Sequence, residues 1–187
     1  MQNKRAAILI AIVLIVFGLL FSTYNGLVTR DVAVAGAWSQ VENVLQRRAD
    51  LIPNLVSSVK GYVKHESEVL ESLAKARTQY AGARSFDEKT KAANQMEGAL
   101  SRLMVIVENY PVLKANESFN KLMDELAGTE NRIAVERMAY NEAVRDFNTT
   151  IRRVPANFIA GPFGFKEKPF FEAEAGAKAV PKVDFSK

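Results

Sequence analysis

The amino-acid sequence predicts an all-α protein, in which an N-terminal transmembrane helix continues into an elongated antiparallel four-helix bundle with an irregular Phe/Pro/Gly-rich C-terminal tail. Three observations support this fold class. An uncharged apolar run lies near the N-terminus, apolar residues recur three and four apart over most of the remaining chain, and Pro and Gly interrupt that spacing in the final segment. We expect the transmembrane segment at 1–28, the bundle at 29–154 and the tail at 155–187.

The N-terminal run is long enough to cross a bilayer. From Ala6 to Phe21 every residue is Ala, Ile, Leu, Val or Phe apart from Gly18, and no charge occurs between Phe21 and Arg30. This uncharged stretch reaches about 36 Å at about 1.5 Å per residue, against a hydrocarbon core of about 30 Å. We therefore expect a transmembrane helix from Ala6 through Phe21 to Val28. A cleaved signal peptide is the alternative, but no small-residue cleavage site comes after the run, which favours an uncleaved signal-anchor.

Basic residues set the expected orientation of this helix. Lys4 and Arg5 precede the apolar run, whereas only Arg30 comes soon after it, beside Asp31. The positive-inside rule then places the N-terminus in the cytoplasm. The protein is thus expected to be single-pass in the cell membrane, with its helical domain on the outer side.

The anchor is expected to continue into the first helix of the bundle. Proline lacks a backbone N–H and disfavours α geometry in the residue before it, so we expect an interruption from Asp50 to Pro53, either a kink or a stop. Arg47, Arg48 and Asp50 lie at this break, where they either cap the helix or guide an acidic surface of a partner. The apolar stripe that predicts the helix contains Val34, Trp38, Val41 and Leu45.

Two further helices are predicted by their stripes and by their end signals. The second carries an apolar stripe from Leu55 and ends near Gly82. Ser85 followed three residues later by Glu88 is a capping-box pattern, which predicts that a third helix begins there. The stripe of this third helix continues to the residue before Pro111, and Pro111 closes it.

The fourth helix is expected to be the longest of the bundle. Asn116 is a favourable N-cap, and an apolar face then extends as far as Pro155 with Gly128 tolerated inside it. Four amphipathic helices joined by short connections favour antiparallel neighbours, so we expect an up-and-down bundle.

The tail from Pro155 onward contains six of the eleven phenylalanines among Gly and Pro residues. Such a segment is not expected to form a regular helix. It either folds back over the bundle and buries its aromatic side chains, or presents an exposed apolar patch to a partner or to lipid.

Four polar residues of the fourth helix form the candidate site. At about 100° per residue, Glu130, Arg137, Asn141 and Asn148 fall within about 40° of one another beside the apolar stripe. We call these four residues the polar seam. One interpretation is a hydrogen-bond network between helices that fixes the register of the bundle, and the other is a groove for a partner or ligand.

Composition and motifs argue against several classes of function. The net charge of +4 includes Lys4 and Arg5, so the rest of the chain is nearly balanced and shows no nucleic-acid footprint. The chain has no cysteine, and His65-Glu66 lacks the second histidine of a zinc-protease motif. The sequence contains no nucleophile motif and no phosphate-binding glycine loop, and we therefore predict no catalytic, cofactor-binding or metal-binding residues.

Several motifs occur in a fixed order along the sequence, at residues 24–28 (Tyr-Asn-Gly-Leu-Val), 37–38, 46–48, 50–56 (Asp-Leu-Ile-Pro-Asn-Leu-Val), 59–62, 108–111 (Glu-Asn-Tyr-Pro), 113–116, 129–134 (Thr-Glu-Asn-Arg-Ile-Ala), 137, 140–141, 144–145, 163–165 and 169–171. In these motifs the sequence resembles the LemA family of small membrane-anchored bacterial proteins. The resemblance implies a transmembrane helix that leads into a helical bundle. It implies no established catalytic activity, and one branch of the family is associated with building magnetosome membranes.

These observations favour a non-catalytic scaffold or adaptor that presents a helical bundle at the membrane. Its expected partners are the lipid bilayer, through the N-terminal helix, and unidentified membrane or envelope proteins; a homo-oligomer is also compatible with the sequence, and nucleic acid is not expected. Two alternatives are an envelope-acting enzyme that uses carboxylates of the bundle and a protein that remodels membranes directly. Converging carboxylates with shifted pKa values would favour the enzyme.

Overall fold

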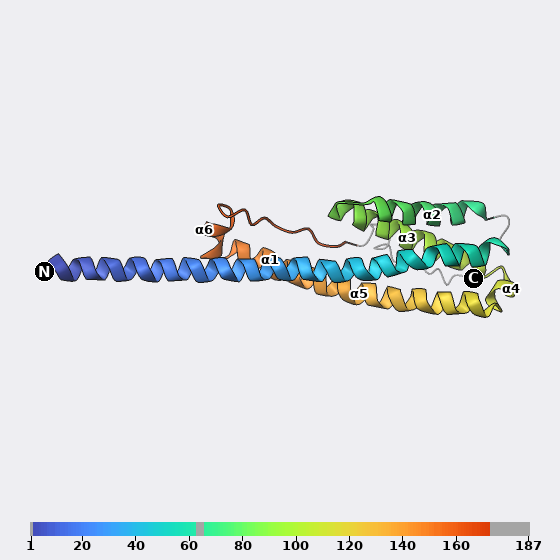
Figure 1. Ribbon diagram of the computed structural model, residues 1–187, viewed down its shortest axis with the longest axis horizontal. Helices are drawn as coiled ribbons and strands as arrows, with labels where there is room; N and C mark the ends of the chain where they lie inside the picture. Colours follow the sequence, from blue (N-terminus) through green and yellow to red (C-terminus); the bar gives the residue numbers. More distant parts are fainter. Residues whose placement is uncertain (1, 63–65, 173–187) are drawn as a thin grey trace, which may run out of the picture. The chain divides into compact units, whose positions relative to one another are not determined.

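The computed structural model describes residues 2–62 and 66–172, and every regular element in these ranges is a helix (Figure 1). The all-α prediction with a long N-terminal apolar helix is therefore confirmed. The chain divides into two compact units, one formed by Met1–Val41 with Glu136–Phe170 and the other by Glu42–Val135 with Phe171–Lys187. The helices are α1 (Gln2–Lys60), α2 (Ser67–Gly82), α3 (Phe86–Val107), α4 (Pro111–Lys114), α5 (Glu117–Arg152) and α6 (Ala156–Ala160).

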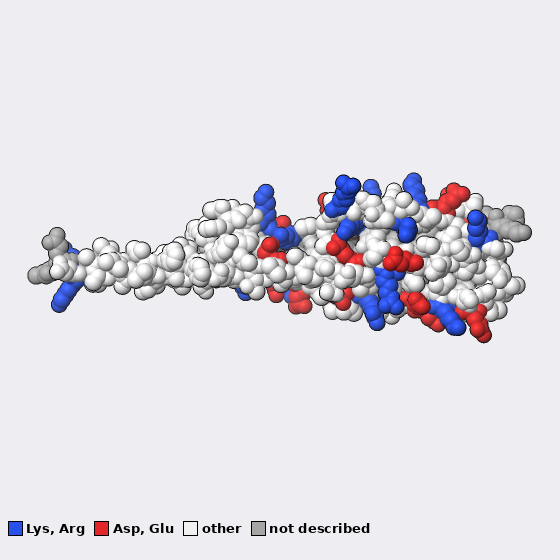
Figure 2. Space-filling view, viewed as in Figure 1, with Lys and Arg blue, Asp and Glu red and all other residues white. Residues whose placement is uncertain are grey.

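Helix α1 contains a segment that is apolar and long enough to cross a membrane. Its most apolar window of 18 residues has a mean hydropathy of 2.8, and none of that window is buried. Figure 2 shows no charged side chain along this stretch on the face in view. A signal sequence can have the same length and composition, so these two properties establish only that the helix could span a bilayer.

Of the two alternatives predicted at Asp50 to Pro53, a stop of the first helix was wrong, and a kink stays a prediction. Helix α1 continues through Pro53 to Lys60, because buried residues on both sides of the proline maintain one packed stripe. Packing of such a stripe outweighs the local cost of about 3 kcal/mol for proline inside a helix. The residues of the stripe around Pro53 are Leu45, Ala49, Ile52, Leu55 and Val59.

The second helix therefore begins later than predicted. Leu55 and Val59 belong to α1, and the Tyr62 N–H closes a turn on the Val59 carbonyl at 2.9 Å, after the end of α1. Helix α2 starts at Ser67 and ends at Gly82, as the end signal predicted.

Helices α2 and α3 pack against each other as a hairpin (Figure 1). The predicted capping box is confirmed at the start of α3. The Glu88 N–H donates to Ser85 Oγ at 3.2 Å, and the Ser85 N–H donates to Glu88 Oε2 at 3.2 Å. The backbone N–H groups of Arg84 and Ser85 both donate to the Glu88 carboxylate and hold its pKa below the usual value. Buried side chains of the two helices are Leu70, Leu73, Ala76, Tyr80, Ala92, Ala93, Met96, Ala99, Leu103 and Val107.

The end of α3 differs from the prediction. It ends at Val107 instead of Tyr110, because Tyr110 precedes a proline and has a non-helical conformation (φ −121°, ψ 77°). Pro111 then starts the short helix α4, which was not predicted from the sequence; proline fits the first position of a helix as well as it closes one.

The start of α5 agrees closely with the prediction. Asn116 Oδ1 accepts the Phe119 N–H at 3.0 Å, which is the expected N-cap. The helix contains Gly128 and ends at Arg152, a few residues short of Pro155. In the unit that contains residues 42–135, the Asn116 amide also donates to the Tyr62 hydroxyl at 3.3 Å, and Arg48 pairs with Glu130. The residue just after the end of α1 thus contacts the residue just before the start of α5, while a residue earlier in α1 contacts one later in α5. The two helices are therefore antiparallel in this unit.

The tail is less uniform than predicted. Ala156–Ala160 forms the short helix α6, whose Ile159 and Ala160 are buried, whereas the segment after Gly164 is irregular as expected. Phe171 is buried, Phe165 is half-buried, and Phe158 and Phe163 are exposed. Some aromatic side chains of the tail are thus buried and others exposed, and a role of the exposed ones toward a partner or lipid stays a prediction. Residues 173–187 lie outside the described part of the chain.

Candidate functional site

Arg48 is a buried arginine in α1. Only 2% of it is exposed, and its Nη2 pairs with Glu130 Oε2 while its Nε donates to Thr129 Oγ1 at 3.4 Å. Thr129 in turn donates to the Leu126 carbonyl at 2.7 Å. The interpretation of Arg48 as a residue that caps a helix end was therefore wrong.

A sequence signal for this burial was present. Arg48 occupies a position of the four-three-four stripe of α1, between Leu45 and Ile52, and such positions face the core of a bundle. A charged residue on that stripe needs a partner, because an unpaired buried charge is very costly. The polar seam contained the partner, Glu130.

A hollow of about 510 Å³ opens beside this ion pair. Apolar side chains of α3 and α5 form most of its wall, with Arg48 and carboxylates among the lining residues. Arg48 Nη1 is buried and has no hydrogen-bond partner in the described part of the chain. We call this space the acidic hollow; its lining residues are Arg48, Glu97, Leu100, Ser101, Met104, Met123, Asp124, Leu126, Ala127 and Glu130. The acidic hollow suits an apolar side chain of another molecule that carries a positive charge nearby.

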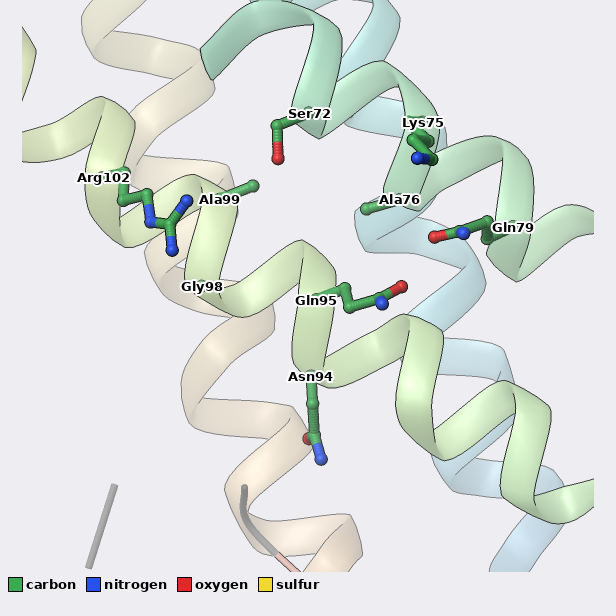
Figure 3. Close-up of a pocket in the computed structure, with 9 residues that line it drawn as sticks. All are labelled: Ser72, Lys75, Ala76, Gln79, Asn94, Gln95, Gly98, Ala99 and Arg102. Carbon is green, nitrogen blue, oxygen red and sulfur yellow. The ribbon is translucent and has the colours of Figure 1, made fainter. Parts of the chain in front are cut away.

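A second hollow of about 310 Å³ lies between α2 and α3 (Figure 3). Its polar lining comes mainly from side chains such as Lys75 and Gln79 of α2 and Gln95 and Arg102 of α3, which the close-up shows around the same space. Lys75, Gln79 and Arg102 are exposed to solvent. This hollow offers hydrogen bonds from solvent-exposed groups and holds no buried charge like that of Arg48.

The polar seam is divided between the two units. Glu130 lies in the second unit, whereas Arg137, Asn141 and Asn148 are half-buried residues of the first unit. Asn148 Nδ2 donates to the Lys168 carbonyl at 2.9 Å, and Asn148 Oδ1 accepts the Lys168 N–H at 2.9 Å. Arg137 and Asn141 also have interaction partners. Whether the seam serves register or binding stays a prediction.

Asn148 belongs to a set of contacts that hold the tail within the first unit. Arg152 donates to both carboxylate oxygens of Glu167, at 2.8 and 2.7 Å, and Lys168 Nζ lies 2.7 Å from Asp31 Oδ1. The hydrogen bonds from Arg152 hold the pKa of the Glu167 carboxyl below its usual value. Sequence reasoning missed this role of Asn148, because nothing local marks a side chain that pairs with backbone twenty residues away.

A titration of the tyrosines is expected to identify two buried phenols. Burial raises the pKa of Tyr140 to about 12, and burial with the nearby Glu42 and Asp50 raises that of Tyr80 to about 12. Each raised pKa contributes stability that is complete below the ordinary value of 10.0 and is lost as the pH rises through about 12. We expect phenolate absorbance to contain a component near pH 12 that is absent from the Tyr80→Phe/Tyr140→Phe variant. An unchanged titration in that variant would contradict this assignment.

The described residues contain no metal-binding geometry. Within 2–62 and 66–172, no group of three or more His, Asp or Glu side chains is arranged to hold a metal ion. His65, the one histidine of the sequence, lies outside the described residues.

Comparisons with known proteins identify the family. A model of the LemA family matches residues 37–185, which is well over half of the chain. The chain belongs to the LemA family. The resemblance seen in the sequence motifs is thereby confirmed.

Individual relatives of this LemA-family protein are more distant. It is 27% identical over 179 residues to magnetosome protein MamQ 2 of Paramagnetospirillum magneticum. This alignment covers 82% of the chain and 66% of the relative. It is 26% identical over 184 residues to magnetosome protein MamQ of Magnetospirillum gryphiswaldense, with 84% and 68% covered. It is 24% identical over 154 residues to protein LemA of Metamycoplasma hominis, with 80% and 68% covered. The chain thus spans about two thirds of the length of these relatives.

Proposed function

We propose that this LemA-family protein is a single-pass, membrane-anchored scaffold that recruits membrane or envelope proteins without catalysing a reaction. In this proposal the N-terminus is cytoplasmic and the helical domain lies on the outer side of the cell membrane. Lys4 and Arg5 before the apolar run, against Arg30 beside Asp31 after it, support that orientation.

The continuity of α1 is the observation that carries the proposal. One helix of 59 residues contains both the exposed apolar segment and the buried stripe that packs with other helices. The buried stripe begins at Leu27, six residues after the apolar run ends at Phe21, and continues to Val59. A helix with this division of surfaces can hold a folded domain at a membrane without a flexible linker.

The acidic hollow supplies a surface for a protein partner. Leu100, Met104 and Met123 provide an apolar wall, and methionine side chains adapt readily to different partners. Asp124 adds negative charge, since Arg48 and Glu130 already offset each other. We therefore propose that the hollow receives an amphipathic segment of a partner in which basic residues flank an apolar anchor.

Photocrosslinking from adjacent positions tests this role. A photoreactive amino acid at Met104, which lines the hollow, should attach a membrane or envelope protein in membranes of the source cells. The matched control is Val105, which is 66% exposed but does not line the hollow. Asp124→Lys should reduce the product several-fold by reversing a charge on the rim. Equal products from both positions, or none from Met104, would count against the scaffold.

The enzyme alternative lacks a specific observation in its favour. Within residues 2–62 and 66–172, the carboxyls with shifted pKa values are Glu88 and Glu167, and both values are lowered by hydrogen bonds that cap a helix or hold the tail. Direct contact with lipid, in contrast, is favoured by the exposed aromatic residues of the tail.

A further inference from the structure

An uncharged apolar segment between basic residues leads from α5 into the tail. Residues 154–165 contain no charged side chain, whereas Arg152 and Arg153 precede them and Lys166 and Lys168 come after them. We call residues 154–165 the aromatic loop. Three of its large apolar side chains are exposed: Val154 by 74%, Phe158 by 69% and Phe163 by 63%. Such a concentration of apolar surface in a short segment indicates a binding role.

Ring contacts fix the position of the aromatic loop along α1. The Tyr24 ring lies 5.1 Å from that of Phe163 and 5.8 Å from that of Phe165. Between these two phenylalanines the chain turns at Gly164, whose φ of 81° favours glycine. Tyr24 lies three residues, or about 4.5 Å of helix rise, beyond Phe21. The loop therefore lies directly beside the end of the candidate membrane-spanning segment.

Charged residues follow the apolar residues both in α1 and in the tail, on the same side of the contact between Tyr24 and the aromatic loop. In α1 the first acid after the apolar run is Asp31, about 10 Å of helix rise beyond Tyr24. In the tail the corresponding residue is Lys168, and the two side chains pair at 2.7 Å. The tail thus changes from apolar to charged over the same interval as α1, which is the change expected where a protein leaves a bilayer.

We propose that the aromatic loop inserts Phe158 and Phe163 into the leaflet from which α1 emerges, forming a second contact with the membrane. This inference rests on the proposed membrane anchor. Aromatic side chains are favoured at the membrane–water interface, and apolar area beside basic residues is typical of interfacial segments.

The flanking charges fit a phospholipid surface. Arg152 and Lys168 are engaged by Glu167 and Asp31, whereas Arg153 and Lys166 form no ion pair within residues 2–62 and 66–172. These two cations remain available for anionic headgroups. With one contact in the loop and one in α1, the membrane would restrict rotation and tilt of the first unit.

Single labels can report this contact, because the chain contains no cysteine. A cysteine carrying a polarity-sensitive fluorophore is placed at Phe158 or Phe163 of the full chain, reconstituted in vesicles of equal parts phosphatidylcholine and phosphatidylglycerol. Met138, 67% exposed in the same unit, is the matched aqueous control. Leu14, 65% exposed in the apolar run, reports the anchor. Quenching is measured with spin-labelled lipid and with aqueous iodide.

We expect spin-labelled lipid to quench the labels at Phe158 and Phe163 several-fold more than the label at Met138, with iodide showing the reverse order. Phe158 provides an independent position if loss of the Phe163 ring disturbs the contact with Tyr24. The inference is overturned if both loop labels behave like Met138 while Leu14 is quenched by lipid; that pattern leaves the anchor intact and favours a protein partner. If Leu14 also behaves like Met138, the anchor and the loop contact both fail.

Discussion

Phe171→Ala is expected to lower the free energy of unfolding by about 3 kcal/mol, the lower end of the usual cost of removing a buried phenylalanine. Phe171 is 4% exposed, and its ring lies 6.5 Å from that of Phe86 in an edge-on arrangement. Removing the ring would leave a cavity against the start of α3 and release the end of the described tail. Urea unfolding of the full chain in detergent, monitored by helical circular dichroism, measures the loss.

The neighbouring residue provides the control for this prediction. Phe170 has the same side chain but is 44% exposed, so Phe170→Ala should change the free energy of unfolding by less than about 1 kcal/mol. A double-mutant cycle with Phe86→Ala should give a coupling of about 0.5–1.5 kcal/mol for the aromatic pair. Equal losses for the Phe170 and Phe171 variants would show that the tail does not pack as described.

Signals confined to a few residues predicted the helix ends well. The capping box at Ser85, the stop at Gly82 and the N-cap at Asn116 all lie where the sequence placed them. In the two caps the side chain bonds to backbone three residues away, so the atoms that decide the structure are close in the chain.

Features that depend on distant contacts were predicted poorly. Pro53 was expected to interrupt α1, but its local cost is outweighed by packing that involves other helices. The burial of Arg48 depends on Glu130, which is 82 residues away. The role of Asn148 likewise depends on the backbone of Lys168, which is 20 residues away. A single sequence records the residues in such contacts but not which of them meet.

Glu130→Ala is expected to lower the free energy of unfolding by about 2–3 kcal/mol. The variant leaves the guanidinium of Arg48 buried without its counter-charge. Removing one partner of a fully buried pair costs about 3–5 kcal/mol, but the Glu130 side chain is 47% exposed, so water reaches the site and reduces the loss. Denaturant unfolding of the full chain provides the measurement.

Two comparisons make this prediction specific. Arg48→Met/Glu130→Ala should be more stable than Glu130→Ala alone, because the second substitution removes the unpaired charge. Glu142→Ala, which removes an exposed partner of Arg145 on the same helix, should cost less than about 1 kcal/mol. A double variant less stable than Glu130→Ala, or equal losses at Glu130 and Glu142, would contradict the burial of Arg48.

Substitutions of Glu130 can distinguish an effect on stability from an effect on partner binding, because Glu130 also lines the acidic hollow. Glu130→Gln retains the side-chain volume and one oxygen that accepts from Arg48, but it removes a negative charge from the rim. We therefore expect Glu130→Gln to retain more stability than Glu130→Ala while reducing partner crosslinking at Met104 several-fold. If crosslinking tracks stability alone across the Ala and Gln variants, the pair of Arg48 and Glu130 serves the bundle, and the partner is recognised elsewhere.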